Sequence, residues 1–343
     1  MKIIFISWAP YCSRSDNIAK KLGGKSYLVY YGMLGSNYWT IFFKYLFQFI
    51  KTYKIFLKER PDIILTMSPP IFAALPAYFW TRFNPAGFII DAHTGAIIDK
   101  RLGRRALFLH KFLSKYAITT IVTNEHLKSI INSWNCHATI ISDVPVEFKN
   151  SAPLKLKPGF TITLINSFAI DEPIETFLAA AERLSKINFY VTGDLNDARR
   201  NKKTITPAPP NVLFTDFLPN DEYTGLLKAS DAVMVITLDD HTMQRGGYEA
   251  VSLQKPLIIS NWEILRKTFY KGAVFIDNTS EGIEKGILKM KENIEKYKVE
   301  VIELKKDRAQ IWNNAQQRLE LLMSEYLEKR TCPQGVGTKG DEN

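Results

Sequence analysis

The sequence predicts an α/β protein of two doubly wound domains, each with a parallel sheet covered by helices on both faces. Strand-length apolar runs alternate with helix-length segments over residues 3–141, and a second alternating set covers residues 161–289. Between them, residues 147–159 are rich in Lys, Pro and Ser and interrupt the alternation. A chain of 343 residues is long enough for about two domains, each with its own core.

The first alternating set defines the N-terminal domain. Its apolar runs are short and nearly continuous, which is typical of strands buried on both faces of a parallel sheet. Strands are expected at residues 3–6, 27–30, 62–66, 87–91, 117–122 and 138–141. Helices are expected at residues 15–22, 38–59, 70–83, 101–115 and 125–133.

The second set defines the C-terminal domain, and a long polar segment follows it. Strands are expected at residues 188–194, 212–219, 231–238 and 255–260, and helices at 223–227, 248–254 and about 300–329. The predicted division is an N-terminal domain (1–147), a linker (148–159), a C-terminal domain (160–299), a C-terminal helix (300–330) and a disordered tail (331–343).

Composition places the chain among ordinary globular proteins, with 46% hydrophobic and 23% charged residues. Cys12, Cys136 and Cys332 have neither a close pair nor a metal-ligand spacing, so we expect reduced thiols in a cytoplasmic protein. The apolar run 2–8 is too short for a signal peptide and predicts a first strand. Asp239 and Asp240 alone do not predict a metal site.

The positive charge lies in the N-terminal half. Residues 1–150 contain 19 basic and 8 acidic side chains, whereas residues 151–343 contain 26 and 27, so the first half carries the whole net charge of +10. A basic face favours a phosphate-rich partner: nucleic acid, an anionic membrane or a phosphorylated lipid. No recognised nucleic-acid-binding module is present, so we expect no nucleic-acid partner.

Residues 38–59 predict an amphipathic helix at a membrane surface. The polar residues recur at spacings of three and four, which places them on one narrow stripe, and nearly all the others are apolar. The stripe comprises Lys44, Gln48, Lys51, Lys54 and Lys58. The lysines interrupt the apolar run well before the ~18 to 20 residues needed for a span. An interfacial helix is therefore expected, with a wholly buried helix as the alternative.

Residues 101–115 form a second basic and apolar segment. Basic and apolar side chains are interleaved here: Arg101, Arg104, Arg105, Lys111 and Lys115 with Leu107, Phe108, Leu109 and Phe112. Alone, this pattern is typical of a solvated helix face. Together with residues 38–59, it predicts peripheral association with an anionic membrane, at its inner, cytoplasmic face.

The most informative segment is residues 239–250, followed by 255–260. It predicts a strand end, a glycine turn, a helix start and a second strand, and the free N–H groups of a helix start suit a phosphate. Gly246 and Gly247 let a phosphate approach the backbone, Arg245 can face a diphosphate, and Glu249 can accept hydrogen bonds from sugar hydroxyls. A tight turn without a ligand is the alternative.

This segment resembles the donor-site signature of family-4 (group 1) glycosyltransferases of GT-B fold. Glu249-Ala250 and Lys255-Pro256-Leu257-Ile258 match it, and further similarity extends over about residues 160–290. The resemblance implies two Rossmann-like domains with an interdomain cleft, of which residues 1–147 bind the acceptor and residues 160–299 bind the nucleotide sugar. It also implies a UDP- or GDP-linked sugar as donor substrate, and neither metal nor cofactor. It also implies retention of anomeric configuration. In two places the chain departs from the signature: the family's first glutamate falls on His241, and its arginine and lysine are missing from the loop 164–173.

The resemblance also implies the site residues. His93 belongs to an Asp91-Ala-His93 sequence similar to the Asp-x-His of lipid-linked mannosyltransferases, and the loop containing Ser13 and Arg14 stands where relatives have a glycine-rich turn. The expected catalytic residues are His93, Arg245 and Glu249. Ser13, Arg14 and Asp91 are expected to contact acceptor or phosphate. The expected donor-binding residues are Asn166, Ser167, Phe168, Gly193, Asp194, Phe217, Leu218, His241, Gln244, Gly246, Gly247 and Tyr248.

The implied activity is transfer of a sugar from a nucleotide sugar to a hydroxyl of a membrane-associated, lipid-linked or saccharide acceptor, as in polysaccharide or glycolipid assembly. The main task of such an enzyme is to stabilise the charge that develops on the departing nucleoside diphosphate. Two alternatives stay open: a nucleotide-sugar epimerase of the same fold, and a non-catalytic subunit of a glycosyltransferase complex.

Overall fold

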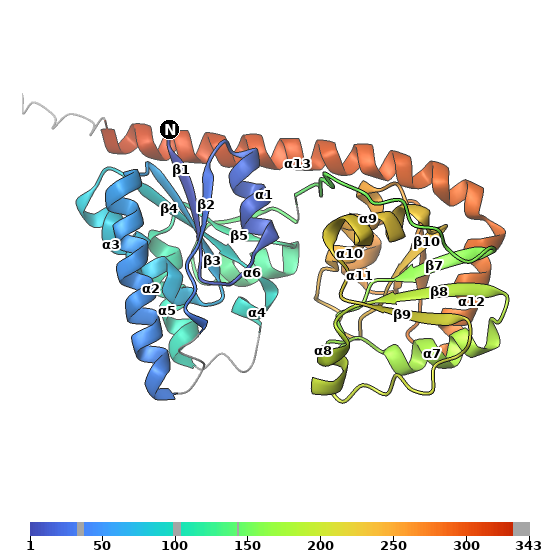
Figure 1. The fold of residues 1–343 in the computed structure, drawn as a ribbon. Coiled ribbons are helices and arrows are strands. Elements are labelled where there is room, and N and C mark those ends of the chain that lie inside the picture. Colours follow the sequence, from blue (N-terminus) through green and yellow to red (C-terminus); the bar gives the residue numbers. More distant parts are fainter. Residues whose placement is uncertain (33–37, 99–103, 143, 332–343) are drawn as a thin grey trace, which may run out of the picture. The chain divides into compact units, whose positions relative to one another are not determined.

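The chain divides into two compact units, each built on one parallel sheet (Figure 1). The computed structural model describes residues 1–32, 38–98, 104–142 and 144–331, with the backbone alone at residues 38, 39, 104, 105 and 331. Unit 1 comprises Met1–Val144 and the chain from Trp312 onward, and unit 2 comprises Pro145–Ile311. The predicted α/β fold is confirmed. The tail expected after Thr331 lies outside the described residues.

Unit 1 contains a six-stranded sheet in the order β2-β1-β3-β4-β5-β6, with every pair parallel. Its strands are β1 (Ile3–Ser7), β2 (Lys25–Leu28), β3 (Ile63–Ser68), β4 (Gly87–Ala92), β5 (Thr120–Val122) and β6 (Ala138–Ile140). Its helices are α1 (Ser13–Lys21), α2 (Tyr38–Glu59), η2 (Ile71–Ala73), α3 (Ala74–Phe83), α4 (Thr94–Ile97), α5 (Arg104–Tyr116) and α6 (Glu125–Ser133).

Both faces of the unit 1 sheet are covered, as its apolar strands require. Successive strand residues point to opposite faces, so Ile4 and Ile6 lie in one core and Ile3 and Phe5 in the other. The core around Ile4 is completed mainly by α2, α3 and α5, and the core around Phe5 by α1 and the C-terminal part of α13 (Ile294–Thr331).

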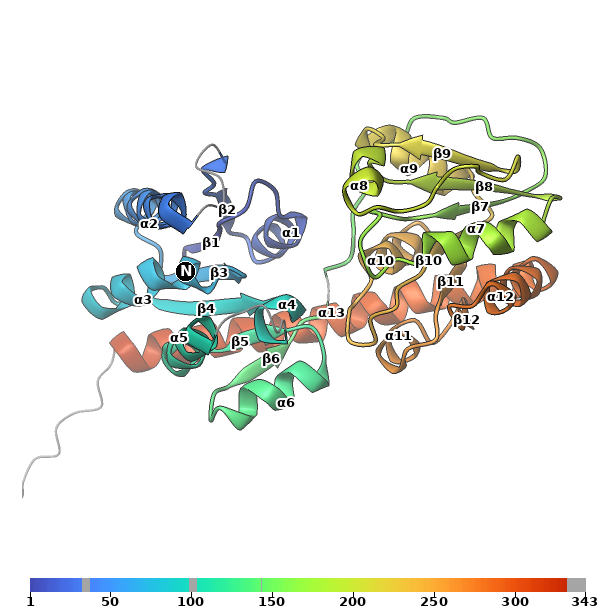
Figure 2. The ribbon, with the colours of Figure 1, turned by 90° about the horizontal axis from the view of Figure 1, so that it is seen from below.

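Unit 2 contains a second six-stranded parallel sheet, in the order β12-β11-β10-β7-β8-β9 (Figure 2). Its strands are β7 (Phe160–Leu164), β8 (Ile187–Thr192), β9 (Val212–Asp216), β10 (Ala232–Val235), β11 (Leu257–Ser260) and β12 (Ala273–Ile276). Its helices are α7 (Ile174–Arg183), α8 (Leu195–Arg200), α9 (Asn220–Ala229), α10 (Arg245–Ser252), α11 (Glu263–Thr268), α12 (Ser280–Glu292) and the first part of α13.

The two faces of the unit 2 sheet are covered by different helices. One core joins the sheet to α7, α8 and α12, and the other joins it to α9, α10, α11 and α13. The chain runs from β7 outward to β9 and then returns to β10 on the other side of β7. Ligands of open α/β sheets bind beside the carboxyl ends of the strands at such a reversal. The loops after β7 and β10 therefore mark the position to search.

Several element boundaries differ from the sequence-based prediction, such as those of β2, β5 and α9, and two further differences bear on the sites. Helix α10 begins at Arg245 rather than Tyr248, so the glycine pair lies within its first turn instead of in a turn before it. Helix α4 has no counterpart in the prediction, because four residues are too few to show a helical period. It begins directly after His93 and packs over His110 of α5, whose Nδ1 lies 3.2 Å from the carbonyl oxygen of Ala96.

The burial of His110 predicts a pH-dependent stability of unit 1. Burial lowers the pKa of His110 from 6.5 to about 4, although the Ala96 carbonyl opposes the shift. The unfolded chain therefore binds a proton between pH 6.5 and 4 that the folded chain does not bind. The stabilisation from His110 is complete above pH 6.5 and falls as the pH is lowered, at most about 1.4 kcal/mol per pH unit.

The measurement is denaturant unfolding of the wild type and of His110→Leu between pH 7 and pH 4. The wild-type unfolding free energy should fall more steeply with decreasing pH than that of the variant. Because exposed carboxylates contribute equally to both proteins, the difference in slope isolates His110. Equal slopes would contradict the assignment.

Candidate functional site

The carboxyl edge of the unit 2 sheet gathers the residues expected to bind the donor. Because all its strands are parallel, the loops after β7, β8, β9 and β10 leave the same edge. These loops contribute Asn166, Ser167 and Phe168, then Gly193 and Asp194, then Phe217 and Leu218, and finally His241 and Gln244. The individual contacts separate the side chains that can meet a ligand from those with a structural role.

Arg245, Glu249 and Tyr223 form a network at the start of α10. Arg245 Nε donates to Glu249 Oε1 at 3.0 Å, and the Tyr223 hydroxyl donates to Glu249 Oε2 at 2.6 Å. Burial first, and then the charge of Glu249, raise the pKa of Tyr223 well above its ordinary value, so this hydroxyl remains a donor. Neither Nη atom of Arg245 has a hydrogen-bond partner within the described part of the chain. The guanidinium is thus anchored through Nε, with both Nη groups available to an anion.

Gly246 and Gly247 are required by packing. A Cβ on Gly246 would lie 3.0 Å from Val235 Cγ2, and a Cβ on Gly247 would lie 2.5 Å from Phe269 Cζ. The glycines therefore let α10 approach β10 and Phe269, whereas the sequence suggested that they admit a phosphate. The N–H groups of Arg245 and Gly246 still supply donors, because the start of a helix leaves them without helical acceptors, whereas the Gly247 N–H donates to the Gln244 carbonyl oxygen.

Two expected donor-binding side chains lie in hydrophobic cores instead. The Tyr248 ring packs against Phe269, with centroids 5.2 Å apart, and the Arg308 guanidinium lies 5.3 Å from its centroid. Phe168 is fully buried on the other face of the sheet, next to Phe214. The prediction that these two side chains contact a donor directly is therefore wrong. The sequence pattern does not show which way each side chain points.

The segment after β8 supports the neighbouring β7 loop. Gly193 has a φ of +118°, and a Cβ there would lie 2.4 Å from the carbonyl oxygen of Asn166, so only glycine allows this approach. The Asp194 carboxylate caps α8 by accepting from the backbone N–H of Asn196 at 2.7 Å. Both residues thus shape the edge of the site, and the capping bond explains the acidic residue at position 194.

Glu172 is a site residue that the sequence did not reveal. Its Oε2 accepts hydrogen bonds from the backbone N–H of Ser167 at 2.8 Å, from the Ser167 hydroxyl at 3.1 Å and from the backbone N–H of Ala169 at 3.0 Å. Burial raises the pKa of the Glu172 carboxyl, although these hydrogen bonds oppose the rise. A carboxylate therefore occupies the loop in which the resemblance implies an arginine and a lysine.

The two loops at the reversal point are joined through Thr237, another residue without a sequence signal. Its hydroxyl donates to Asp171 Oδ2 at 2.6 Å, and its N–H donates to the Ser260 hydroxyl at 2.9 Å. The Asp171 carbonyl oxygen in turn accepts from the N–H of Leu238 at 2.7 Å. These bonds fix the β10 loop against the β7 loop, which gives the edge a defined shape.

Apolar side chains are exposed along the same edge. Phe217 is 77% exposed after β9, Ile170 is 76% exposed in the β7 loop, and Leu238 is 54% exposed after β10. Of these only Phe217, with its half-buried neighbour Leu218, was expected. Exposed apolar groups on loops that leave this edge suit the flat face of a ring-shaped ligand.

His241 and Gln244 occupy different environments in the β10 loop. His241 is half-exposed, and its Nε2 lies 3.5 Å from Asp240 Oδ1. Gln244 is buried and immediately precedes α10, where its carbonyl oxygen accepts from the N–H of Gly247. His241 is thus the accessible side chain at the position of the family's first glutamate.

In unit 1, Asp91 lies between Arg14 and His93 at the carboxyl end of β4. Arg14 Nε lies 3.0 Å from Asp91 Oδ2 and Arg14 Nη2 lies 3.0 Å from Oδ1, while His93 Nε2 lies 3.7 Å from Oδ2. Asp91 is only 1% exposed. Its burial favours the neutral acid, but the Arg14 charge and then His93 outweigh this effect and hold the pKa of Asp91 well below its ordinary value.

Arg14 has a structural role here instead of contacting phosphate. Besides Asp91, it donates to the backbone carbonyls of Ile141 at 2.8 Å and Ser142 at 3.2 Å, and the whole residue is buried. A guanidinium with these partners is not available to an incoming phosphate. Ser13 begins α1 beside it and is half-buried. His93, partly exposed and backed by Asp91, is the accessible polar group of this cluster.

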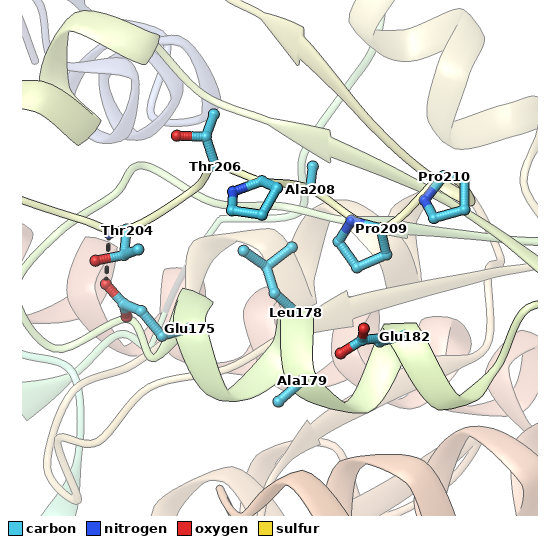
Figure 3. Close-up of a pocket in the computed structure, with 10 residues that line it drawn as sticks. Glu175, Leu178, Ala179, Glu182, Thr204, Thr206, Ala208, Pro209 and Pro210 are labelled. Atoms are coloured by element: carbon cyan, nitrogen blue, oxygen red, sulfur yellow. Dashed lines mark hydrogen bonds between the residues drawn. The ribbon is translucent and has the colours of Figure 1, made fainter.

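A separate cavity of ≈ 410 Å³ lies between α7 and residues 204–210 (Figure 3). Leu178 points toward the proline-containing segment, and Glu175 accepts a hydrogen bond from the N–H of Thr204 at 2.9 Å. None of the expected site residues lines this cavity. It therefore lies outside the candidate donor site. Over the described ranges, the acidic, histidine and cysteine side chains form no group of three that could hold a metal ion.

Comparison with known proteins relates the chain to a group of solved structures. No protein-family model matches the sequence, and no curated protein matches it. Sucrose-phosphate synthase from Thermosynechococcus elongatus has a TM-score of 0.72 and 14% identity, over 95% of this chain and 99% of that one. Anabaena HepE in complex with UDP-glucose has a TM-score of 0.69 and 12% identity, over 95% and 100%. Staphylococcus aureus MnaA with UDP has a TM-score of 0.62 and 13% identity, over 95% and 97%. With two parallel six-stranded sheets and these likenesses, the chain has the GT-B fold.

Proposed function

We propose that the protein is a glycosyltransferase that uses a nucleotide sugar and binds it at the carboxyl edge of the unit 2 sheet. The observation that carries the proposal is the Arg245–Glu249–Tyr223 network, which fixes a guanidinium with free Nη groups beside the first turn of α10. The bound UDP-glucose of HepE and the bound UDP of MnaA, two proteins of similar fold, support the ligand class.

In this proposal, unit 2 stabilises the departing nucleoside diphosphate. The Nη groups of Arg245 and the N–H groups of the α10 first turn face the diphosphate, and they are held in place before the reaction. A helix terminus alone contributes roughly 0.3 to 2 kcal/mol, so the arginine must supply a large part of the stabilisation. Glu249 orients Arg245, and its remaining lone pairs can accept from ribose hydroxyls.

In the same proposal, the exposed apolar side chains bind the base and His93 contacts the acceptor. Phe217, aided by Ile170 and Leu238, offers a surface on which a uracil or guanine ring can stack. In unit 1, His93 lies with its Nε2 3.7 Å from Asp91 Oδ2, and the proposal gives this partly exposed imidazole the role of general base toward an acceptor hydroxyl. The proposed reaction retains anomeric configuration. It also needs no metal, and an assay with and without EDTA tests this second point.

Calorimetric titration with UDP, GDP and their sugar conjugates tests the proposed ligand class. Binding of one nucleoside diphosphate, followed by sugar transfer to a membrane-extracted acceptor pool, is the expected result. No binding of any nucleotide would overturn the proposal and favour a non-catalytic subunit. Release of free nucleotide with no transfer to any acceptor would favour an epimerase of this fold.

We also propose that unit 1 docks on an anionic membrane, where it meets a lipid-linked or otherwise membrane-associated acceptor. The outer surface of α2 exposes large apolar side chains that a soluble domain normally covers. They are Phe42 (67% exposed), Phe43, Leu46, Phe47, Ile50 and Leu57. Gln48, expected in the polar stripe, is buried, and its Nε2 donates to the Val29 carbonyl oxygen at 2.8 Å. The predicted polar stripe was therefore wrong at this residue.

Helices α3 and α5 extend this surface. Both cover the same face of the sheet as α2, and they expose Phe79, Phe83, Phe108 and Tyr116. Between α3 and α5, the Arg82 guanidinium lies 4.7 Å from the Tyr78 centroid and 4.4 Å from the Tyr116 centroid, without an acidic partner in the described residues. Exposed apolar groups beside Lys51, Lys54, Lys58 and Arg82 match the chemistry of an anionic lipid surface. No helix of the described ranges has both the length and the hydropathy to cross a bilayer.

A double substitution of Phe42 and Phe47 by glutamate should weaken binding to vesicles containing anionic phosphatidylglycerol by at least about tenfold, because two inserted aromatic groups are lost. Co-sedimentation with vesicles, compared with vesicles of phosphatidylcholine alone, measures the effect. Leu288→Glu on α12 replaces an exposed apolar side chain on a helix of unit 2. It is the control and should bind like the wild type. If the wild type binds neither the phosphatidylglycerol vesicles nor the phosphatidylcholine vesicles and forms a dimer, the surface is an interface between two copies of the chain.

A further inference from the structure

The β7 loop is built as an anion site, and its own Glu172 fills it. Two backbone N–H groups and one hydroxyl converge on a single oxygen, Glu172 Oε2, at 2.8, 3.0 and 3.1 Å. Phe168, between the two donor residues, has a φ of +56°, and its own N–H donates to Asn166 Oδ1. Successive N–H groups around a left-handed residue form the concave nest in which proteins hold phosphate oxygens.

The loop is held in this shape by contacts that do not involve the Glu172 carboxylate. Asn201 Nδ2 donates to the Phe168 carbonyl oxygen at 2.9 Å, and Lys203 Nζ donates to the carbonyl oxygens of Ile170 at 3.1 Å and Glu172 at 2.6 Å. The Phe168 ring is anchored in the core. Removing the carboxylate therefore leaves the backbone supports of the nest in place.

One further donor in the loop lacks an acceptor. Asn166 is 5% exposed, and its buried Nδ2 has no hydrogen-bond partner in the described part of the chain. An unsatisfied buried donor is costly, and a water molecule or an incoming anion can supply its acceptor. A phosphate has more oxygen acceptors than one carboxylate oxygen, so it could satisfy this amide in addition to the donors that Glu172 already uses.

We propose that the backbone N–H groups of Ser167 and Ala169, with the Ser167 hydroxyl, form a phosphate-binding nest that Glu172 closes as an internal anion. A phosphate group must displace the Glu172 carboxylate to enter. The site is open only when that side chain rotates away, so Glu172 sets the affinity of the loop for phosphate. Both inorganic phosphate and the diphosphate of a nucleotide have the required chemistry.

The test is rescue of a variant by inorganic phosphate. Glu172→Ala removes the internal anion and should bind inorganic phosphate at least about tenfold more tightly than the wild type, because no carboxylate competes for the donors. The thermal midpoint of Glu172→Ala should rise saturably with phosphate and not with chloride at the same ionic strength. In amide hydrogen exchange, the Ser167 and Ala169 N–H groups should be protected in the wild type, exposed in the variant and protected again by phosphate.

Two further variants keep the test decisive. Glu182→Ala on α7 removes an exposed carboxylate from the same unit and should leave phosphate affinity unchanged, which excludes a general effect of charge. Glu172→Gln keeps an accepting oxygen without the charge, so it should fold even if Glu172→Ala does not, with phosphate affinity above that of the wild type. Phosphate affinity equal to the wild type in whichever of these Glu172 variants folds would overturn the proposal.

A second experiment distinguishes inorganic phosphate from the diphosphate of a nucleotide as the ligand. It also keeps this proposal testable independently of the proposed transferase activity. UDP should gain affinity in Glu172→Ala while uridine should not, if a nucleotide diphosphate uses the nest. A gain for inorganic phosphate without a gain for UDP would assign the nest to free phosphate. Because the phosphate measurement requires no nucleotide sugar, it can succeed when no transferase activity is found, and it can fail when transfer is observed.

Discussion

Replacing Arg14 by methionine is expected to destabilise unit 1 by about 3–5 kcal/mol, the usual effect of removing one partner from a buried ion pair. The variant leaves the Asp91 carboxylate buried without the guanidinium that bonds both of its oxygens. It also frees the carbonyl oxygens of Ile141 and Ser142. Denaturant unfolding followed by a probe in unit 1 measures the loss.

Two control variants distinguish the effect of losing a buried ion pair from the effect of losing an exposed one. Lys128→Met removes the exposed partner of Glu125 on α6 and should cost less than about 1 kcal/mol. Combining Arg14→Met with Asp91→Leu removes both charges and should recover part of the stability lost in the single variant. A single variant as stable as Lys128→Met would show that the Arg14–Asp91 pair contributes little.

Replacing Arg245 by alanine is expected to lower kcat/KM for sugar transfer by about 10²- to 10³-fold, the range seen when one preorganised charge-stabilising donor is removed. Within the Arg245–Glu249–Tyr223 network, Arg245 is the partly exposed side chain whose Nη groups have no hydrogen-bond partner in the described residues. The affinity for the nucleoside diphosphate should fall as well, whereas that for the nucleoside should not. Steady-state kinetics and calorimetry measure the two effects.

Lys267→Ala is the matched control for Arg245→Ala. Lys267 forms the same i,i+4 ion pair with Glu263 on α11 that Arg245 forms with Glu249 on α10. Its loss should leave kcat/KM within about twofold, because an exposed pair of this kind contributes little. Undiminished transfer by Arg245→Ala, from every nucleotide sugar accepted by the wild type, would refute the assignment of the donor site.

Contacts between close neighbours along the chain can be derived from the sequence, whereas contacts between distant residues cannot. Arg245 and Glu249 are one helical turn apart, so their pairing follows from the spacing alone. Tyr223 lies 26 residues from Glu249, and only the packing of α9 against α10 shows that its hydroxyl bonds the same carboxylate. Arg14 shows the opposite outcome, because its partner Asp91 is 77 residues away and converts an expected phosphate ligand into a structural group.

The sequence alone determined the two doubly wound sheets, since continuous apolar runs separated by helix-length segments allow few other arrangements. It also determined the long apolar helix α2 and the order of the strands and helices that carry the candidate site. Only the tertiary structure decided that Gly246 and Gly247 serve helix packing, that Gln48 is buried and that Glu172 fills the β7 loop. These outcomes depend on which side chains meet from distant parts of the chain, whereas a periodic pattern records only the neighbours along one helix or strand.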